Sequence, residues 1–208
     1  MIEYFLKGGI FMYPILFFFI FGLAIVIERF WTLTRASVNT RKFMERIKAA
    51  LDEGGIQKAQ EVCEETRGPI ASIFHAGLMR SNKGIDQVEK AIMNAGSIEM
   101  AFLEKGLIWL ATVISIAPML GFTGTVQGMV VAFNAIAAAN NISPAIVATG
   151  IGVALLTTLF GLVVAIIIQF FHNYFISRID HIIIEMEESS TEFIDALVER
   201  EEKLGLGK

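Results

Sequence analysis

The longest uncharged stretch of the chain sets the strongest limit on its fold. Between Lys105 and Arg178 there are 72 consecutive residues without Asp, Glu, Lys or Arg. A transmembrane helix needs about 20 mostly apolar residues, because the hydrocarbon core of a bilayer is about 30 Å thick. The stretch is therefore long enough for two membrane spans, and it predicts a helical hairpin with a short turn between the two helices.

A second uncharged stretch, between Lys7 and Glu28, predicts a further span. It ends in Glu28-Arg29-Phe30-Trp31 and not in the small residues of a signal-peptide cleavage site, so we interpret it as a retained membrane helix. Hydrophobic residues make up 54% of the chain. We therefore expect an all-α membrane protein with three transmembrane helices and long cytoplasmic helical extensions.

The distribution of Lys and Arg predicts the orientation of the spans. Six Lys and Arg residues occur between positions 29 and 48, whereas the turn of the hairpin, 138–144, has no charge. The side of a span that is rich in Lys and Arg faces the cytoplasm. The predicted segments are a periplasmic N-terminus 1–8, a transmembrane helix 9–33, a cytoplasmic helical region 34–100, a transmembrane helix 101–137, a periplasmic turn 138–144, a transmembrane helix 145–177 and a cytoplasmic tail helix 178–208.

The soluble regions of the sequence predict helices and no enzyme. Gly54-Gly55 and Gly68-Pro69 are expected to break the region 34–100 into separate helices. The sequence has no Gly-rich phosphate loop, and His75, His172 and His181 lack the spacing of metal ligands. We therefore expect no catalytic residue, no metal site and no cofactor. A net charge of −4 without a basic stripe argues against nucleic acid as a partner.

Small and hydroxyl-bearing residues recur on one face of each span of the hairpin. On the second span they are Pro118, Gly121, Thr125, Gly128 and Ala132, and on the third they are Ala154, Thr158, Gly161 and Ala165. Such faces allow close packing of membrane helices, and this is the commoner explanation; the polar lining of a pore is the alternative. Neither span contains an Asp or Glu deep in the membrane, so this chain by itself lacks the titratable carboxyl group that proton transport usually needs there.

Three motifs resemble those of the ExbB/TolQ/MotA proton-channel family. Within that family, the chain most resembles the ExbB/TolQ branch. The segment Ala117-Pro-Met-Leu-Gly-Phe-Thr-Gly-Thr-Val-Gln-Gly-Met129 resembles the family signature AP-x-LGLLGTV-x-GM. Ala154-Leu-Leu-Thr-Thr-Leu-Phe-Gly-Leu162 is similar to ALLxTxxGL of the last span. Gly8-Gly-Ile-Phe-Met-Tyr-Pro-Ile15, with Glu28-Arg29, resembles the first span. The resemblance covers nearly the whole chain and favours the pore interpretation.

The resemblance implies a subunit of an inner-membrane motor driven by the proton-motive force. Family members form homo-oligomers, typically pentamers, around an ExbD/TolR-like single-span partner whose membrane helix carries an Asp, and they energise outer-membrane transport or envelope processes, in some cases through a TonB-like transducer. Membrane lipid is the other implied partner. By motif position, Thr125 and Thr158 line the ion pathway. The residues that shape the pore and its helices are Pro118, Gly121, Gly124, Gly128 and Gly161.

The sequence leaves other functions open, and it departs from the family pattern at one position. The chain is alternatively a flagellar-type stator subunit or a non-conducting membrane scaffold; a transporter with its own substrate site is a weaker option, because no inverted repeat is visible.

The last-span motif of the family often continues to a proline, but Ile167 stands at that position. We therefore expect the third helix to continue through residue 167 without a kink.

Overall fold

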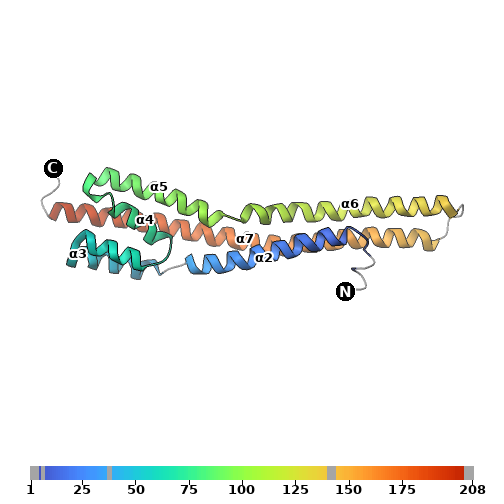
Figure 1. Cartoon of the computed structure of the whole chain (residues 1–208), viewed down its shortest axis with the longest axis horizontal. Coiled ribbons are helices and arrows are strands. Elements are labelled where there is room, and N and C mark those ends of the chain that lie inside the picture. Colours follow the sequence, from blue (N-terminus) through green and yellow to red (C-terminus); the bar gives the residue numbers. More distant parts are fainter. Residues whose placement is uncertain (1–4, 6–7, 37–38, 140–143, 204–208) are drawn as a thin grey trace. The chain divides into compact units, whose positions relative to one another are not determined.

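The computed structural model describes residue 5 and residues 8–36, 39–139 and 144–203. Within these residues the chain is helical and has no strand, which confirms the all-α class. The helices, labelled as in Figure 1, are α2 (Met12–Ala36), α3 (Thr40–Glu65), α4 (Pro69–Leu78), the 3-10 helix η1 (Ser81–Lys83), α5 (Ile85–Glu104), α6 (Leu107–Ala139) and α7 (Pro144–Lys203).

Three helices are long and apolar enough to cross a membrane, as predicted. They are α2, α6 and the N-terminal half of α7. The 33 residues of α6 extend over about 50 Å at 1.5 Å per residue, more than the hydrocarbon core of a bilayer requires. Large apolar side chains such as Phe122 and Ile166 are exposed on these helices, where lipid would surround them.

The orientation of these helices and the boundaries between the predicted segments stay predictions. Residues 140–143 of the predicted turn 138–144, and most of the predicted N-terminal segment (residues 1–8), lie outside the described residues. The third apolar helix is continuous through Ile167, as expected from the absence of a proline there. It also continues beyond the apolar stretch without a break as far as Lys203.

The first of two compact units consists of residues 1–29 and 106–175 and contains most of α2, α6 and the N-terminal half of α7. A Cβ atom on Gly22 of α2 would lie 2.9 Å from the Ile168 side chain of α7 and 3.4 Å from that of Val113 in α6. Ile168 and Val113 are fully buried. The three helices therefore meet at a glycine, which lets α2 approach the other two closely.

The second unit consists of residues 30–105 and 176–208 and has a core of stacked aromatic rings. Phe74 of α4 stacks on Phe193 of α7 with ring centroids 4.2 Å apart, and on Phe43 of α3 at 5.6 Å. All three side chains are buried. This stack joins three helices, and other apolar residues of the tail helix, among them Ile182 and Met186, are also buried.

Both predicted helix breaks of the region 34–100 occur. Gly55 has φ 70° and ψ −156° inside α3, and Gly68 precedes Pro69, the first residue of α4. Proline suits that position because its missing N–H has no helical partner there. Between the two breaks, Cys63 is buried, and burial, with a smaller contribution from Glu64, raises the pKa of its thiol to about 12. The thiol therefore stays protonated and unreactive at neutral pH.

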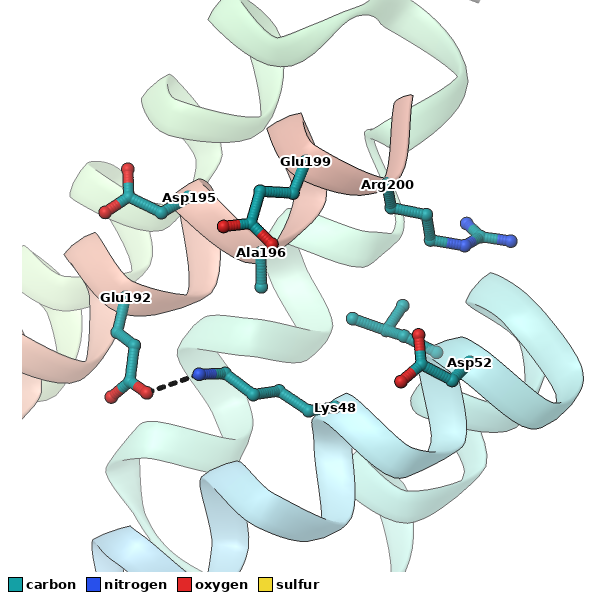
Figure 2. Close-up of a pocket in the computed structure, with 8 residues that line it drawn as sticks. Lys48, Asp52, Glu192, Asp195, Ala196, Glu199 and Arg200 are labelled. Atoms are coloured by element: carbon teal, nitrogen blue, oxygen red, sulfur yellow. Dashed lines mark hydrogen bonds and ion pairs between the residues drawn. The ribbon is translucent and has the colours of Figure 1, made fainter. Parts of the chain in front are cut away.

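The break at Gly55 lies beside the end of α7. A Cβ atom on Gly55 would be 2.8 Å from a guanidinium nitrogen of Arg200. Figure 2 shows the neighbouring ion pair, in which Lys48 Nζ of α3 lies 2.5 Å from Glu192 Oε1 of α7. Both side chains of that pair are about half exposed, so it contributes at most about 1 kcal/mol. The ion pair therefore adds little to the packing of this segment of α3 against α7.

We predict that Gly55→Ala lowers the thermal stability of the full chain in detergent. Gly55 adopts a backbone conformation that is costly for other residues, so the change should destabilise the second unit by about 1–3 kcal/mol. The matched control is Gly96→Ala in α5, where a Cβ atom meets nothing within 4 Å and alanine favours the helix. Circular dichroism melting curves measure both. Equal melting temperatures for Gly55→Ala and the unmodified chain would contradict the prediction.

Candidate functional site

Glycines bring the backbones of α6 and α7 into direct contact. A Cβ atom on Gly161 of α7 would lie 2.5 Å from the carbonyl oxygen of Ala117 in α6, and one on Gly121 would lie 3.0 Å from Cα of Thr158. Farther along, a Cβ on Gly128 would lie 2.9 Å from the carbonyl oxygen of Gly150. Side chains at these positions would collide with main-chain atoms that cannot move aside, so only glycine allows this packing. We call this contact the α6–α7 seam.

Thr157 fills the middle of the seam. Its side chain is 1% exposed, and a Cβ atom on Gly124 would lie 2.5 Å from its Oγ1. The hydroxyl donates a hydrogen bond to the carbonyl oxygen of Ala154 in its own helix, at 2.8 Å. Gly124 therefore serves to make room for a buried threonine, which is a packing role.

Thr158 bonds across the seam. Its Oγ1 donates to the carbonyl oxygen of Gly121 at 3.0 Å, and this hydrogen bond joins α7 to α6. Unlike Thr157, the Thr158 side chain is only half-buried. It therefore lies at the edge of the seam and not in its interior.

Thr125 lies on the same edge of α6. It is half-buried, and its Oγ1 donates to the carbonyl oxygen of Phe122 at 2.6 Å. In an α-helix the backbone N–H of residue 125 bonds to the carbonyl of residue 121, which is the same oxygen that accepts from Thr158. The two threonines predicted for the ion pathway are therefore linked through one carbonyl group, that of Gly121.

Pro118 lies within α6 one turn before this group and is half-buried. Because proline has no N–H, the carbonyl of Ile114 lacks its normal helical donor. The helix nevertheless continues from Leu107 to Ala139. The residues predicted for the ion pathway and for shaping the pore thus divide in two: Gly121, Gly124, Gly128 and Gly161 are buried in the seam, whereas Pro118, Thr125 and Thr158 border it.

The chemistry available at this edge is that of neutral hydroxyl groups. Both hydroxyl protons already point to backbone carbonyls, so each threonine oxygen offers lone pairs and can accept a hydrogen bond from a neighbouring acid. Neither group can bind or release a proton in the physiological range. The site can therefore solvate a titratable group, but the proton itself must be held by another residue.

Two residues of the seam, Thr157 and Gly150, and a cavity next to it are not among the features predicted from the sequence. Gly150 faces Gly128, and its spacing of four residues from Ala154 is the signal that would have extended the small-residue face. An apolar cavity of about 470 Å³ lies within the first unit and is bordered by Gln127 and Thr149. Of the predicted residues of the hairpin, Gly124, Gly128 and Ala132 line this cavity, whereas Thr125 and Thr158 do not.

Two basic side chains near the ends of the apolar helices are also more buried than their types suggest. Arg29 of α2 is 4% exposed, and its guanidinium donates to both carboxylate oxygens of Glu28, at 2.6 and 2.9 Å. This arrangement gives a structural reason for the Glu28-Arg29 pair at the end of the first span. In α7, Nδ1 of His172 is buried and has no hydrogen-bond partner among the described residues.

Comparison with known proteins identifies the class to which this arrangement belongs. The model of the MotA/TolQ/ExbB proton channel family matches residues 65–188. The chain is 34% identical over 187 residues to a putative biopolymer transport protein ExbB homolog of Methanothermobacter thermautotrophicus, an alignment that covers 89% of this chain and 66% of that protein. It is 32% identical to a putative ExbB-like protein of Synechocystis, covering 80% and 66% of the two chains.

A further relative, the Tol-Pal system protein TolQ of Haemophilus influenzae, is 29% identical over 93% of this chain and 90% of its own length. The chain thus spans just under two thirds of the first two relatives and nearly all of the third. The chain belongs to the MotA/TolQ/ExbB proton channel family. The resemblance inferred from its motifs is confirmed, with relatives named both ExbB and TolQ.

We predict that Gly161→Ala weakens the seam. The new methyl group would lie 2.5 Å from the Ala117 carbonyl oxygen, so α6 and α7 must separate, at a cost of about 1–3 kcal/mol. Gly152→Ala in the same helix is the control, because a Cβ atom there has nothing within 4 Å. Thermal unfolding in detergent should show a lower midpoint for Gly161→Ala only. A midpoint lowered equally by Gly152→Ala would show that the loss does not come from the seam.

Proposed function

We propose that this chain is the channel-forming subunit of a motor in the bacterial inner membrane that is driven by the proton-motive force. In this proposal several copies, expected to be five, surround the membrane helix of an ExbD/TolR-like partner that carries one Asp. Thr125 and Thr158 face that Asp and line the ion pathway. The N-terminus is periplasmic, and most of the soluble portion of the chain is cytoplasmic.

The observation that carries the proposal is the absence of acid from the hairpin of two apolar helices, in a chain of a proton-channel family. From residue 106 to residue 177 the sequence contains no Asp or Glu, although the family is one of proton channels. A proton that crosses the hydrocarbon region is normally held by a titratable side chain. A partner helix with an Asp supplies this group, and the hydroxyl edge of the α6–α7 seam offers a polar surface for it.

The hydrogen bonds of the two threonines indicate how they would respond to the charge of the Asp. A protonated carboxyl group can donate to the free lone pairs of Thr158, which leaves the bond to Gly121 in place. An ionised carboxylate needs donors, so the Thr158 hydroxyl must rotate away from Gly121. The Gly121 carbonyl still accepts from the Thr125 backbone N–H, so the rotation leaves no unsatisfied group on α6.

The energies permit such a rotation to be driven by one proton. A hydrogen bond between membrane helices contributes about 0.6 kcal/mol on average and at most about 1.7 kcal/mol. An elementary charge that crosses 100 mV releases about 2.3 kcal/mol. Exchange of the Thr158 hydroxyl between Gly121 and the partner carboxylate is therefore within the energy of a single proton, whereas unfolding of a helix is not.

The process that the complex energises is proposed from the names of the relatives, because the geometry of this chain does not indicate it. Relatives named as biopolymer transport proteins and as members of the Tol-Pal system support the energising of outer-membrane transport, through a TonB-like transducer, or of an envelope process. A flagellar-type stator is the second candidate, because the matching family includes MotA. The count of three apolar helices in the described chain favours the ExbB/TolQ type over the four-span MotA type.

We predict that Thr158→Val abolishes energy transduction but preserves assembly. Valine keeps the shape and removes the hydroxyl, and loss of one interhelical hydrogen bond costs too little to separate α6 from α7. Thr157→Val is the matched control, because that hydroxyl bonds only within its own helix. Proton uptake by proteoliposomes that contain the complex, together with size-exclusion chromatography, measures both effects. Full proton flux through Thr158→Val would overturn the assigned role and favour the non-conducting scaffold.

The proposed motor has a defined subunit composition, which can be measured. Native mass spectrometry of the complex purified from its own host should show five copies of this chain with a small single-span protein whose apolar helix contains an Asp. This result is expected because residues 106–177, which form most of the hairpin, hold no carboxyl group. A homo-oligomer without any acidic-helix partner would contradict the motor and leave the scaffold as the better explanation.

A further inference from the structure

An apolar groove that the proposed function does not use lies between α5 and α7 in the second unit. Its volume is about 380 Å³. The α5 side is formed by Met93, Gly96 and Met100, and the α7 side by Ile183, Met186 and Ile194. Methionine side chains are flexible and polarisable, and they recur on surfaces that bind apolar faces of varied shape. Three of the nine methionines of the chain therefore border a single groove.

The floor of this groove is open. A Cβ atom on Gly96 would have no heavy atom within 4 Å, although Gly96 lies in the interior of an α-helix where alanine or a larger residue would be more stable. Met93 is 65% exposed at the edge of the groove. The packing of this unit by itself thus leaves an apolar space that a further element can fill.

Each of the two helices that form the groove contributes one acidic residue to its lining. Glu89 of α5 and Glu187 of α7 are the charged residues that line it, and no Lys or Arg lines it within the described residues. Both carboxylates are exposed. A mostly apolar groove with one carboxylate on each helix is complementary to a helix that has an apolar stripe and carries Lys and Arg.

We propose that this groove, which we call the α5–α7 groove, binds a basic amphipathic helix of a partner protein. The apolar stripe of that helix lies against Met93, Met100 and Met186, with a side chain entering the space above Gly96. Its Lys and Arg side chains pair with Glu89 and Glu187. The site lies outside the apolar spans and is independent of the ion pathway.

Charge favours such a partner over a second copy of this chain. The two helices that form the exposed surface here are both acidic: α5 contains four Asp or Glu and one Lys, and residues 176–203 contain nine Asp or Glu and three Lys or Arg. A second copy that presented either helix would place like charges against Glu89 and Glu187. The basic start of α3 is no better suited, because its apolar residues Phe43, Met44 and Ile47 are buried in its own unit.

Binding of a labelled model peptide to the full chain tests the α5–α7 groove. The chain is held in nanodiscs of zwitterionic lipid, and empty nanodiscs measure the binding of the peptide to lipid alone. The probe is a synthetic helix with Leu at helical spacing and Lys elsewhere. Gly96→Leu fills the groove from its floor and should weaken binding by about tenfold or more, whereas Gly96→Ala, which adds one methyl group, should bind as the unmodified chain does. Fluorescence anisotropy measures the affinity. Because the Gly96 site is open, neither variant should lose helical circular dichroism.

The two carboxylates of the groove, Glu89 and Glu187, give an independent test of the proposed binding. Replacing both Glu89 and Glu187 by Gln should weaken binding of the Lys peptide and reduce its dependence on salt concentration. A peptide with Glu in place of Lys should not bind. Equal affinity of the Lys peptide for the chain and for Gly96→Leu would overturn the proposal. So would a change in the number of chains per complex on Gly96→Leu, because it would show that a second copy covers the groove.

Discussion

The contact between the backbones of α6 and α7 is the constraint on which the rest of the site depends. At Gly161 and Gly121 the helices are too close for any side chain, and this closeness brings the Thr158 hydroxyl within 3.0 Å of a carbonyl oxygen on the other helix. In lipid, where apolar side chains gain little by leaving one apolar medium for another, close van der Waals packing and interhelical hydrogen bonds are what hold helices together. The glycines thus provide both the packing and the position of the polar groups.

The same helix, α7, serves two different environments along its length. In residues 144–175 large apolar side chains such as Leu155 and Ile166 are exposed, as expected for a helix that contacts lipid. In residues 176–203 the apolar residues Ile179 and Phe193 are buried and acidic residues are exposed, as expected for a helix in water. The exposed face of the helix changes from apolar to acidic, while the helix itself continues without a break.

Because residues 106–177 contain no Asp or Glu, the proposed motor needs two chains, one with the hydroxyl groups and one with the acid. The hydroxyl edge formed by Thr125 and Thr158 can solvate a carboxyl group in either charge state, but it cannot carry the proton. A mobile acid on a partner helix and fixed hydroxyls on this chain are consistent with a rotating or rearranging element within a stable frame. The dense seam next to the hydroxyls supplies the rigidity that such a frame needs.

The sequence by itself determined the elements, and tertiary structure decided the roles of individual residues. Uncharged length and the positions of glycine and proline were enough to predict three apolar helices, the breaks at Gly55 and Gly68 and a tail helix, because these depend on local hydrophobicity and on single-residue backbone preferences. The sequence placed Gly121, Thr125 and Gly128 on one face of the helix. It did not separate them, since helical periodicity cannot distinguish the centre of a face from its edge. Only the packed structure shows that the glycines are buried in the seam while the threonine lies at its edge, because that distinction depends on the contact between α6 and α7.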